Sequence, residues 1–386
     1  MRIIWPVVDL YTGENQLMGI MILASMLKRA GFESMVVEAN YKEIRKAIMQ
    51  GNNPVIIAFS TLTVHSPYLL SLNKKVKRDF RVYSIFGGPH PTFFPKMIYE
   101  EAVDAICRGE GEYAMMELVQ ALTEGRPAKS ISNLWTKDNG KVYKNSLRPL
   151  IHDLDELPLP DHKIFQNAIP HNIWYAAVMA SRGCPYKCSY CFNHVYREMY
   201  KGKGKYVRRR SVDHVLEELK KIRNERCYKF IKFADDIFSL SPQWLEEFCP
   251  KYRDKIGLPF SCLVRANHVD SNVIELLKMA GCHRITMGIE AGDDYVRNDI
   301  LKRRMARETI VRAANLIKDA GIRLQTANIV GIPGGSFQSE YETLKLNIEC
   351  RSDYSGVTLM QPYYSTEIYK KAGELGMIDD IDYRGA

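Results

Sequence analysis

The sequence has no long apolar run, no charged leader and no balanced set of cysteines. No window approaches eighteen consecutive apolar residues, so no membrane-spanning helix is expected. The first six residues, MRIIWP, read as a strand and lack the pattern of a signal peptide. Nine cysteines, an odd number scattered over 386 residues, argue against a disulfide scaffold. These absences favour a cytoplasmic protein in a reducing compartment.

The chain is long enough for two domains, and its excess of basic residues is concentrated in one place. A length of 386 residues exceeds one typical domain, and 46% hydrophobic residues provide sizeable cores. The net charge is +9, and much of it lies in residues 197–210, where Gly202 and Gly204 predict a mobile, solvated loop. An anionic substrate is the alternative use of this stretch. Nucleic acid is not favoured, because no RNA-binding module is recognisable.

Three closely spaced cysteines carry the strongest chemical signal. Cys184, Cys188 and Cys191 are separated by three and then two residues, a spacing that can wrap one side of a cubane cluster. Cluster proteins usually supply four cysteines, so a group of three indicates an iron kept open for substrate or cofactor. A turn with two cysteines would indicate zinc or a redox dithiol instead. Ordinary core cysteines are the plain alternative, which Gly183 and Pro185 disfavour because they make a loop here.

The pattern Cys-x-x-x-Cys-x-x-aromatic-Cys resembles the cluster loop of the radical S-adenosylmethionine (SAM) enzymes. Cys184, Cys188, Tyr190 and Cys191 match it position by position. The resemblance implies a 4Fe–4S cluster on the three cysteines, with SAM chelated by the open iron. It also implies that an electron from the cluster cleaves SAM to a 5′-deoxyadenosyl radical, and that an external donor such as flavodoxin or ferredoxin supplies this electron. The remaining cysteines show no second metal spacing and are expected to be buried core residues.

Residues 1–125 predict a doubly wound parallel sheet. Short runs rich in β-branched residues alternate with helical patterns, the first of them over 17–29. Ligands of such a sheet bind at the carboxyl ends of its strands. The expected strands are Ile3–Val8, Ser34–Glu38, Pro54–Phe59, Val82–Phe86 and Asp104–Cys107.

The loops after these strands are rich in glycine and small hydroxyl residues, which let a backbone approach a large flat ligand closely. Each loop by itself indicates no more than a nucleotide site. In this order, ahead of the cluster loop, they resemble the cobalamin-binding domain of cobalamin-dependent radical SAM enzymes, a resemblance that extends over essentially the whole chain. The cobalamin contacts that it implies are Ser60, Thr61, Leu62, Thr63, Gly87, Gly88, Pro89, Gly109 and Glu110.

One departure from that family concerns the axial ligand of cobalt. Many cobalamin domains carry Asp-x-His-x-x-Gly after the first strand, whose histidine replaces the lower ligand of the cofactor. Here the corresponding residues, 9–15, contain no histidine. Cobalt without a protein ligand, another axial residue and a domain that has lost cobalamin all stay open. His65 and His90 are expected to have structural or hydrogen-bonding roles, and a place near the ring is the alternative for each.

The second half predicts a partial (β/α)6 barrel of the radical SAM type over residues 174–386. Residues 126–173 are expected to be a linker that includes a hairpin, with Asn139 and Gly140 at its turn. Catalytic groups of such a barrel lie at the carboxyl ends of its strands. The six expected strands are Ala176–Ala180, Phe230–Phe233, Phe260–Val264, Arg284–Met287, Leu324–Val330 and Val357–Met360.

Polar residues gather at the carboxyl ends of these strands. The resemblance implies that the end of the fourth strand contacts the ribose or amino acid group of SAM, and that the glycine-rich fifth strand lies against the adenine. Glu290 and Gly331 occupy those places, so they are expected SAM contacts together with Tyr190 of the cluster loop and Asp236 after the second strand. A salt bridge to a basic residue is the alternative for each carboxylate, including Asp235.

The function implied by the resemblance is cobalamin-dependent radical SAM methylation of an unactivated carbon in a small-molecule substrate. Alternatives within the family are oxidation, cyclisation or ring rearrangement, without methyl transfer or without cobalamin. The non-enzyme alternative is an iron–sulfur sensor or RNA-binding protein. Related proteins often extend past the sixth strand, so we expect either a short member or a pocket that a partner or a further segment completes.

Overall fold

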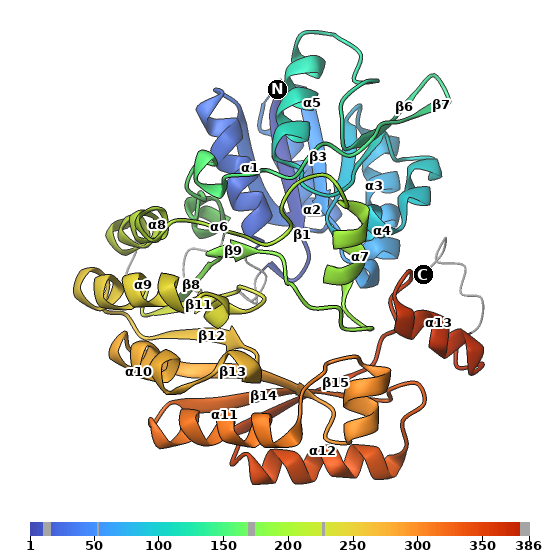
Figure 1. Ribbon diagram of the computed structural model, residues 1–386. Helices are drawn as coiled ribbons and strands as arrows, with labels where there is room; N and C mark the ends of the chain where they lie inside the picture. Colours follow the sequence, from blue (N-terminus) through green and yellow to red (C-terminus); the bar gives the residue numbers. More distant parts are fainter. Residues whose placement is uncertain (11–16, 52–53, 169–173, 226–227, 379–386) are drawn as a thin grey trace.

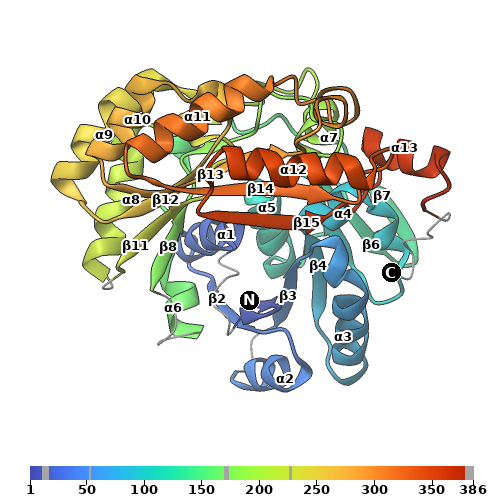
Figure 2. The ribbon, with the colours of Figure 1, turned by 90° about the horizontal axis from the view of Figure 1, so that it is seen from below.

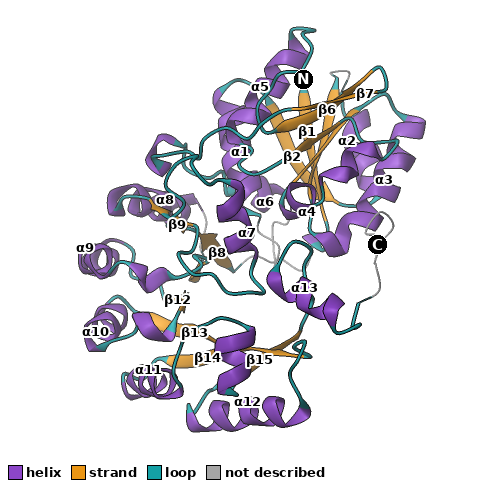
Figure 3. Ribbon diagram, turned by 45° about the vertical axis from the view of Figure 1, so that its right-hand side comes forward, coloured by secondary structure: helices purple, strands orange, loops and turns teal. Residues whose placement is uncertain are grey.

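The computed structural model describes residues 1–10, 17–51, 54–168, 174–225 and 228–378. It contains two α/β units, each built on a parallel sheet (Figure 1). The blue-to-teal unit begins at the N-terminus, and the yellow-to-red unit follows it. The loops between β8 and α8 lie on the side of the second sheet that faces the first unit (Figure 3). No helix in the described part of the chain is long and apolar enough to cross a membrane.

The first sheet is doubly wound, as predicted. Its parallel strands follow the order β2-β1-β3-β4-β5, and helices cover both faces. Alternate residues of β1 serve the two faces, since Ile3 packs in the core that contains α1 and α5, whereas Ile4 packs with α2 and α3. The strands are β1 (Arg2–Val7), β2 (Glu33–Glu38), β3 (Val55–Ser60), β4 (Tyr83–Gly87) and β5 (Ala105–Cys107); the helices are α1 (Met18–Arg29), α2 (Tyr41–Met49), α3 (Ser66–Asp79), α4 (Pro89–Phe93) and α5 (Glu112–Thr123).

The predicted hairpin forms, but it belongs to the first sheet and not to a free linker. Its strands β6 (Leu134–Asp138) and β7 (Lys141–Lys144) continue the sheet beyond β5 in antiparallel pairing. Asn139 and Gly140 have positive φ angles of 47° and 77°, as the turn requires. Without the hairpin, β5 would have an edge of unpaired backbone N–H and C=O groups, and pairing with β6 satisfies them. The first sheet therefore extends to Lys144, past the expected boundary at residue 125.

The second sheet is the predicted six-stranded open barrel. Its parallel strands follow the chain order β8-β11-β12-β13-β14-β15, and β8 does not pair with β15. Helices α8 to α12 cover its outer face (Figure 2). The strands are β8 (Tyr175–Val178), β11 (Phe230–Phe233), β12 (Phe260–Val264), β13 (Cys282–Glu290), β14 (Arg323–Val330) and β15 (Tyr354–Leu359); the helices are α8 (Val212–Glu225), α9 (Pro242–Lys255), α10 (Ser271–Met279), α11 (Arg307–Asp319) and α12 (Phe337–Glu349).

The alternation of residues along β13 explains how this sheet presents polar groups at its mouth. Ile285, Met287 and Ile289 are fully buried in the apolar core, whereas Gly288 and Glu290 are half-buried. Because successive side chains of a strand point to opposite faces, the second set faces the inside of the barrel. The strand thus carries Glu290 to its carboxyl end on the open side.

The basic stretch 197–210 is not the mobile, solvated loop that was expected. It continues α7 (Phe192–Met199) and includes β10 (Arg208–Arg209), which pairs with β9 (Ser181–Arg182). Arg208 and Arg210 are buried because the carboxylates of Glu110 and Glu218 neutralise them. Among the basic residues of this stretch, Lys201 and Lys205 are exposed, as a solvated loop would require. Most of its charge therefore stabilises the fold and is not available to an anionic substrate.

Candidate active site between the two sheets

The cysteine loop leaves the carboxyl end of β8 and enters α7, so it lies at the mouth of the barrel. Gly183 precedes it with a φ of +87°, and a Cβ there would lie 2.6 Å from the backbone oxygen of Tyr206, so glycine is required. Ser189 anchors the loop, since its Oγ donates to the carbonyl of Ile300 at 2.6 Å and its backbone N–H donates to the carbonyl of Leu301 at 3.1 Å. The loop is therefore held in place by the barrel itself.

The three cysteines of this loop fit a cubane cluster. Cys188 is buried, and Cys184 and Cys191 are half-buried. Burial raises the pKa of Cys184, and it raises the pKa of Cys191 to about 11; the charge of Cys188 adds to both shifts. Bound iron would relieve this mutual repulsion of the thiolates. No group of three potential ligands in the described chain converges as a single metal ion requires, whereas a cubane cluster places three cysteines on three different irons.

Two predicted SAM contacts, Glu290 and Tyr190, meet at an arginine that sequence reasoning missed. Arg303 lies after β13 and is buried; its Nη1 lies 3.2 Å from Oε1 of Glu290 and donates to the hydroxyl of Tyr190 at 2.7 Å. Burial raises the pKa of Glu290, although the charge of Arg303 opposes this shift. Glu290 has a positive φ of 68°, and the absence of a side chain at Gly288 leaves room for its carboxylate. The alternative of a salt bridge thus holds for Glu290 in this structure.

The neighbouring aspartates have different surroundings. Asp235 is fully buried and accepts hydrogen bonds from the Ser181 hydroxyl and, at 3.1 Å, from the N–H of Ala180, so it stabilises the start of the cluster loop. Asp236 accepts a hydrogen bond from Nδ2 of Asn193 in α7 at 3.0 Å. Burial raises the pKa of Asp236, and the Asn193 hydrogen bond opposes this. Asp236 therefore lies beside the cysteine loop.

Gly331 ends β14 in a conformation that suits glycine. Its φ is +70°, and a Cβ there would lie 2.8 Å from Cδ1 of Leu359. Its N–H donates to Oε1 of Glu340 at 2.7 Å. These contacts are those of a residue at the end of a strand, and the place of Gly331 beside adenine stays a prediction.

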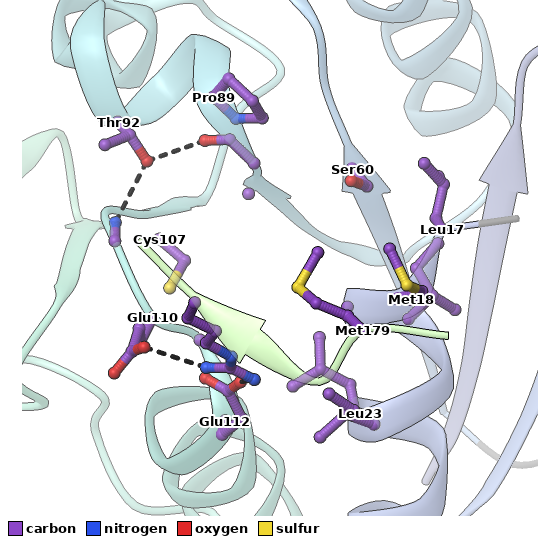
Figure 4. A pocket seen from close by; sticks show the side chains of 18 of the residues that line it. Leu17, Met18, Leu23, Ser60, Pro89, Thr92, Cys107, Glu110, Glu112 and Met179 are labelled. Atoms are coloured by element: carbon purple, nitrogen blue, oxygen red, sulfur yellow. Dashed lines mark hydrogen bonds and ion pairs between the residues drawn. The ribbon is translucent and has the colours of Figure 1, made fainter. Parts of the chain in front are cut away.

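A cavity of about 800 Å³ lies between the two units, at the carboxyl ends of both sheets (Figure 4). This volume is within the range of small-molecule and cofactor sites. One side of the wall is apolar: Leu17 directly precedes α1, Met18 and Leu23 lie in α1, and Met179 follows β8 (Figure 4). Tyr190, Cys191 and Phe192 of the cluster loop line the cavity too; the predicted cobalamin contacts that line it are Ser60, Gly87, Gly88, Pro89, Gly109 and Glu110.

Thr61, Leu62 and Thr63 are not among the residues that line this cavity. Thr61 is buried and acts through its backbone, whose N–H donates to the Gly87 carbonyl at 2.8 Å and whose carbonyl accepts from His90 N–H at 2.9 Å. Leu62 is exposed. The structure therefore does not bring these three predicted contacts to the cavity, because the chain turns away from the sheet after Ser60.

The two glycine loops form a cradle of bare backbone. Gly88 and Gly109 have φ angles of +89° and +77°, and a Cβ on Gly88 would lie 2.9 Å from the backbone nitrogen of Thr61. A Cβ on Gly109 would collide with the hydroxyl of Tyr200. The Thr92 hydroxyl joins the loops, since it accepts from Gly109 N–H at 3.1 Å and donates to the Gly88 carbonyl at 2.7 Å. The two missing side chains make room for Thr61 and Tyr200, and both glycines line the cavity. Backbone therefore forms this part of the wall, as the close approach of a large flat ligand such as a corrin requires.

The carboxylate of Glu110 is occupied by ion pairs across the two units. Its Oε1 lies 2.9 Å from Arg182 Nη1 and 2.9 Å from Arg208 Nη2, while Glu112 Oε1 lies 2.6 Å from Arg182 Nη2. Burial raises the pKa of Glu110, but the pairs with Arg208 and Arg182 outweigh it and hold this pKa below its ordinary value. Because Arg182 directly precedes the loop at Gly183, these pairs fix the cluster loop against the first unit.

The histidines considered for the axial position lie away from the cavity wall. His90 is buried, stacks on Phe94 and lies 3.3 Å from the hydroxyl of Thr63 through Nδ1. Burial lowers the pKa of His90 to about 4, so it is neutral at pH 7. Neither His90 nor His65 lines the cavity. Residues 11–15 of the loop that departs from the family pattern lie outside the described residues.

Two family models match the chain, and both agree with the division into two sheets. The model of the B12 binding domain matches residues 4–119. The model of the radical SAM superfamily matches residues 178–346, which include the three cysteines.

Several proteins are similar to this chain over most of its length. The uncharacterized methyltransferase PH0819 of Pyrococcus horikoshii is 29% identical over 378 residues, which cover 95% of this chain and 80% of that protein. The anaerobic magnesium-protoporphyrin IX monomethyl ester cyclase of Rubrivivax gelatinosus is 25% identical and covers 99% of this chain and 72% of its own length.

Solved structures share the fold at low sequence identity. The radical SAM methyltransferase TsrM from Kitasatospora setae, solved with tryptophan substrate and a SAM analogue, superposes with a TM-score of 0.79 at 16% identity, over 97% of this chain and 76% of that chain. The cobalamin-dependent SAM radical enzyme OxsB, solved with aqua-cobalamin and SAM, gives a TM-score of 0.73 at 18% identity, over 99% and 55%.

Proposed function

This chain belongs to the radical SAM superfamily and carries a B12-binding domain ahead of its radical SAM domain, and we propose that it methylates an unactivated carbon of a small molecule. It is a cobalamin-dependent radical SAM enzyme whose cofactors are a 4Fe–4S cluster, SAM and cobalamin. The similarity to a methyltransferase over 95% of the chain supports the transfer of a methyl group. The identity of the methyl acceptor is the part that the experiment below addresses.

A single observation carries this proposal: one cavity joins the glycine cradle of the first unit to the cluster loop of the second. Gly88 and Gly109 line it from one side, and Tyr190 and Cys191 line it from the other. A flat cofactor held on the cradle would therefore face the cluster loop, whose Phe192 also lines the cavity. Proximity of two cofactors is what the transfer of a methyl group to a radical carbon requires.

The side chains of this site bind, orient and exclude water. We infer that Cys184, Cys188 and Cys191 hold the cluster and that the glycine cradle holds cobalamin. When bound, the cluster and SAM supply a 5′-deoxyadenosyl radical, and cobalamin supplies the methyl group. The apolar wall of α1 keeps water from the reactive groups, which favours radical chemistry because it prevents side reactions.

We keep Tyr190, Asp236, Glu290 and Gly331 as the proposed SAM contacts. The paired charges of Glu290 and Arg303 offer both signs at the mouth of the barrel, which suits the amino and carboxylate groups of SAM. Asp236, with its raised pKa and its hydrogen bond from Asn193 of α7, lies beside the cluster loop.

A radical SAM enzyme needs an external reductant, and we propose flavodoxin or ferredoxin in a cytoplasmic setting. Both classes deliver single electrons at low potential. The expected small-molecule substrate stands, but the support for an anionic one falls with the burial of Arg208 and Arg210.

The test is anaerobic reconstitution of the purified protein with iron, sulfide and hydroxocobalamin, followed by gel filtration and an absorption spectrum. We expect a retained corrin spectrum together with stoichiometric iron and sulfide. Incubation with deuteromethyl SAM, dithionite and candidate substrates is then expected to yield 5′-deoxyadenosine, S-adenosylhomocysteine and a product carrying the labelled methyl group. A protein that retains no corrin would contradict the cobalamin assignment.

Cyclisation is the second candidate, because the similarity to the magnesium-protoporphyrin IX monomethyl ester cyclase covers 99% of the chain. The same incubation separates the two. Cyclisation gives 5′-deoxyadenosine without S-adenosylhomocysteine and leaves the product unlabelled. The variant Cys188→Ala is the control in both cases, since it is expected to abolish SAM cleavage.

A further inference from the structure

Arg265 is a buried cation at the mouth of the barrel with no carboxylate partner among the described residues. It follows β12 directly, and its side chain is 4% exposed. Its Nη2 donates to the carbonyl of Arg303, and its Nε has no hydrogen-bond partner. Glu290 lies near enough to feel its charge, but the ion pair of Glu290 is with Arg303.

The guanidinium of Arg265 is instead held against the cysteine loop. Its Nη1 lies 3.9 Å from Sγ of Cys188, within hydrogen-bonding range for sulfur. Its central carbon lies 3.8 Å from the centre of the Tyr186 ring, which belongs to the segment between the first two cysteines. Tyr186 is itself fixed by Nε2 of His268 and Nδ2 of Asn267, each 2.6 Å from its hydroxyl. Tyr186, held in place by these two neighbours, thus keeps the cation beside the sulfur.

A guanidinium stays charged at every physiological pH, so burial without an anion is strongly unfavourable. The sulfur of Cys188 is the nearest group that becomes an anion when it ligates iron. A thiolate-ligated 4Fe–4S cluster carries net negative charge, and this charge increases by one when an electron enters. A fixed positive charge a few ångströms away therefore stabilises the reduced state more than the oxidised state.

We propose that Arg265 sets the reduction potential of the cluster, acting through Cys188 as a positioning residue and not as a catalytic one. The step is the transfer of one electron from a low-potential external donor to the cluster; no bond forms or breaks and no proton moves. Arg265 raises the midpoint potential and so brings reduction within reach of that donor. This inference rests on the proposed function only in that the three cysteines hold the cluster.

The experiment is a redox titration with dithionite and mediator dyes, read by the electron paramagnetic resonance signal of the reduced cluster. It compares the wild type with Arg265→Gln and Arg265→Lys. At a fixed solution potential, we expect Arg265→Gln to lower the ratio of reduced to oxidised cluster at least tenfold, which is a shift of about 59 mV for one electron. Arg265→Lys keeps the charge, so its ratio is expected to stay within about threefold of the wild type.

Arg209→Gln is the matched control. Like Arg265, Arg209 has its guanidinium over an aromatic ring, with its central carbon 4.8 Å from the centre of the Trp244 ring; it lies in β10, and its Nη2 donates to the carbonyls of Ile237 and Phe238. No contact joins it to a cluster cysteine among its described interactions. Its removal is expected to leave the potential unchanged.

Each outcome decides the proposal. A midpoint potential of Arg265→Gln equal to that of the wild type overturns it, as does a shift of the same size in the Arg209→Gln control. If Arg265→Gln assembles no cluster, Arg265→Lys decides the proposal, because a ratio of reduced to oxidised cluster that differs from the wild type by more than about threefold overturns it. If the Lys variant also fails, geometry and not charge matters, and the proposal falls. A wild type without iron and sulfide refutes the proposed function itself.

Discussion

Replacement of Arg182 by Met removes the cation that bridges Glu110 and Glu112, the residues that fix the cluster loop to the first unit. Glu112 depends most on this arginine. Its carboxylate is buried, Oε1 lies 2.6 Å from Arg182 Nη2, and Oε2 has no hydrogen-bond partner. Glu110 keeps Arg208 at 2.9 Å and the N–H of Ile151 at 2.9 Å, so it loses less.

The magnitude follows from the burial of the orphaned carboxylate. Breaking a buried pair by removing one partner costs about 3–5 kcal/mol. The side chain of Arg182 is 19% exposed, so water can enter in its place, and we expect the lower end of this range, about 3 kcal/mol at pH 7. The assay is chemical unfolding followed by circular dichroism, with the loss of the absorption of the bound cluster as a second probe of the loop.

The double variant Arg182→Met/Glu112→Leu tests whether the loss of stability comes from the unpaired charge of Glu112. Because it removes both buried charges, its stability is expected to return to within about 1 kcal/mol of the wild type. Arg126→Met is the control, since it breaks an exposed pair with Glu124 at 2.5 Å and is expected to change little. A single variant that loses less than about 1 kcal/mol, or a double variant whose loss is the sum of the single losses, would refute the reasoning.

The pH dependence of stability is a second test of the ion pairs between Glu110 and the two arginines. The pKa of Glu110 is lower in the folded protein than its ordinary value, because the pairs with Arg208 and Arg182 outweigh burial. The stability that this provides is therefore present above the unfolded-state pKa of about 4.3 and is lost as the pH falls through the folded-state pKa. The acid limb of the stability profile is expected to be shallower in Arg182→Met than in the wild type.

Three further predictions concern the cofactor sites and a buried histidine. Cys188→Ser is expected to lose most of its bound iron and sulfide while its far-ultraviolet circular dichroism stays unchanged; full retention of iron would contradict the cluster assignment. Gly109→Ala places a Cβ against the Tyr200 hydroxyl at a φ of +77°. It is expected to weaken cobalamin binding at least tenfold, as measured by spectroscopic titration. Gly125→Ala, whose Cβ would meet nothing within 4 Å, is the control. Burial lowers the pKa of His90 to about 4, so folding favours its neutral form. Stability is therefore expected to fall as the pH drops from about 6.5 towards 4. His90→Asn is expected to reduce this slope in unfolding titrations.

Local sequence signals predicted the two sheets well. Runs of β-branched residues separated by helical patterns place the strands of both units. In the first sheet the reason is that a strand buried on both faces must be apolar along its whole length. In the barrel, β13 alternates, and only one of its faces lies in the apolar core. The hairpin was predicted from Asn139 and Gly140, since its turn requires positive φ angles at both. Its pairing with β5 was not, because the hydrogen bonds of an edge strand leave no mark on the sequence of its partner.

The same limit applies to the charged residues. The cluster of basic residues at 197–210 resembled a solvated surface by composition. Arg208 is buried because Glu110, almost a hundred positions earlier, comes to lie beside it. Arg265 was predicted among the polar residues at the carboxyl end of the third barrel strand, but its contact with Cys188 was not, and Arg303 carried no signal; both lie near the cysteine loop only in the folded barrel. Glu110 was predicted as a cobalamin contact, which stays a prediction, but its ion pairs with Arg182 and Arg208 were not foreseen.

The sequence by itself determined those features that depend only on neighbours along the chain. The spacing of Cys184, Cys188 and Cys191 lies within one loop, and the need for glycine at Gly88 and Gly109 is expressed at the residue itself as a positive φ. The tertiary structure alone decided which loops share a cavity, which carboxylates are already paired, and where a cation is buried beside a cysteine. Those are contacts between residues far apart in the chain, whose energies depend on burial and distance and so exist only in the folded protein.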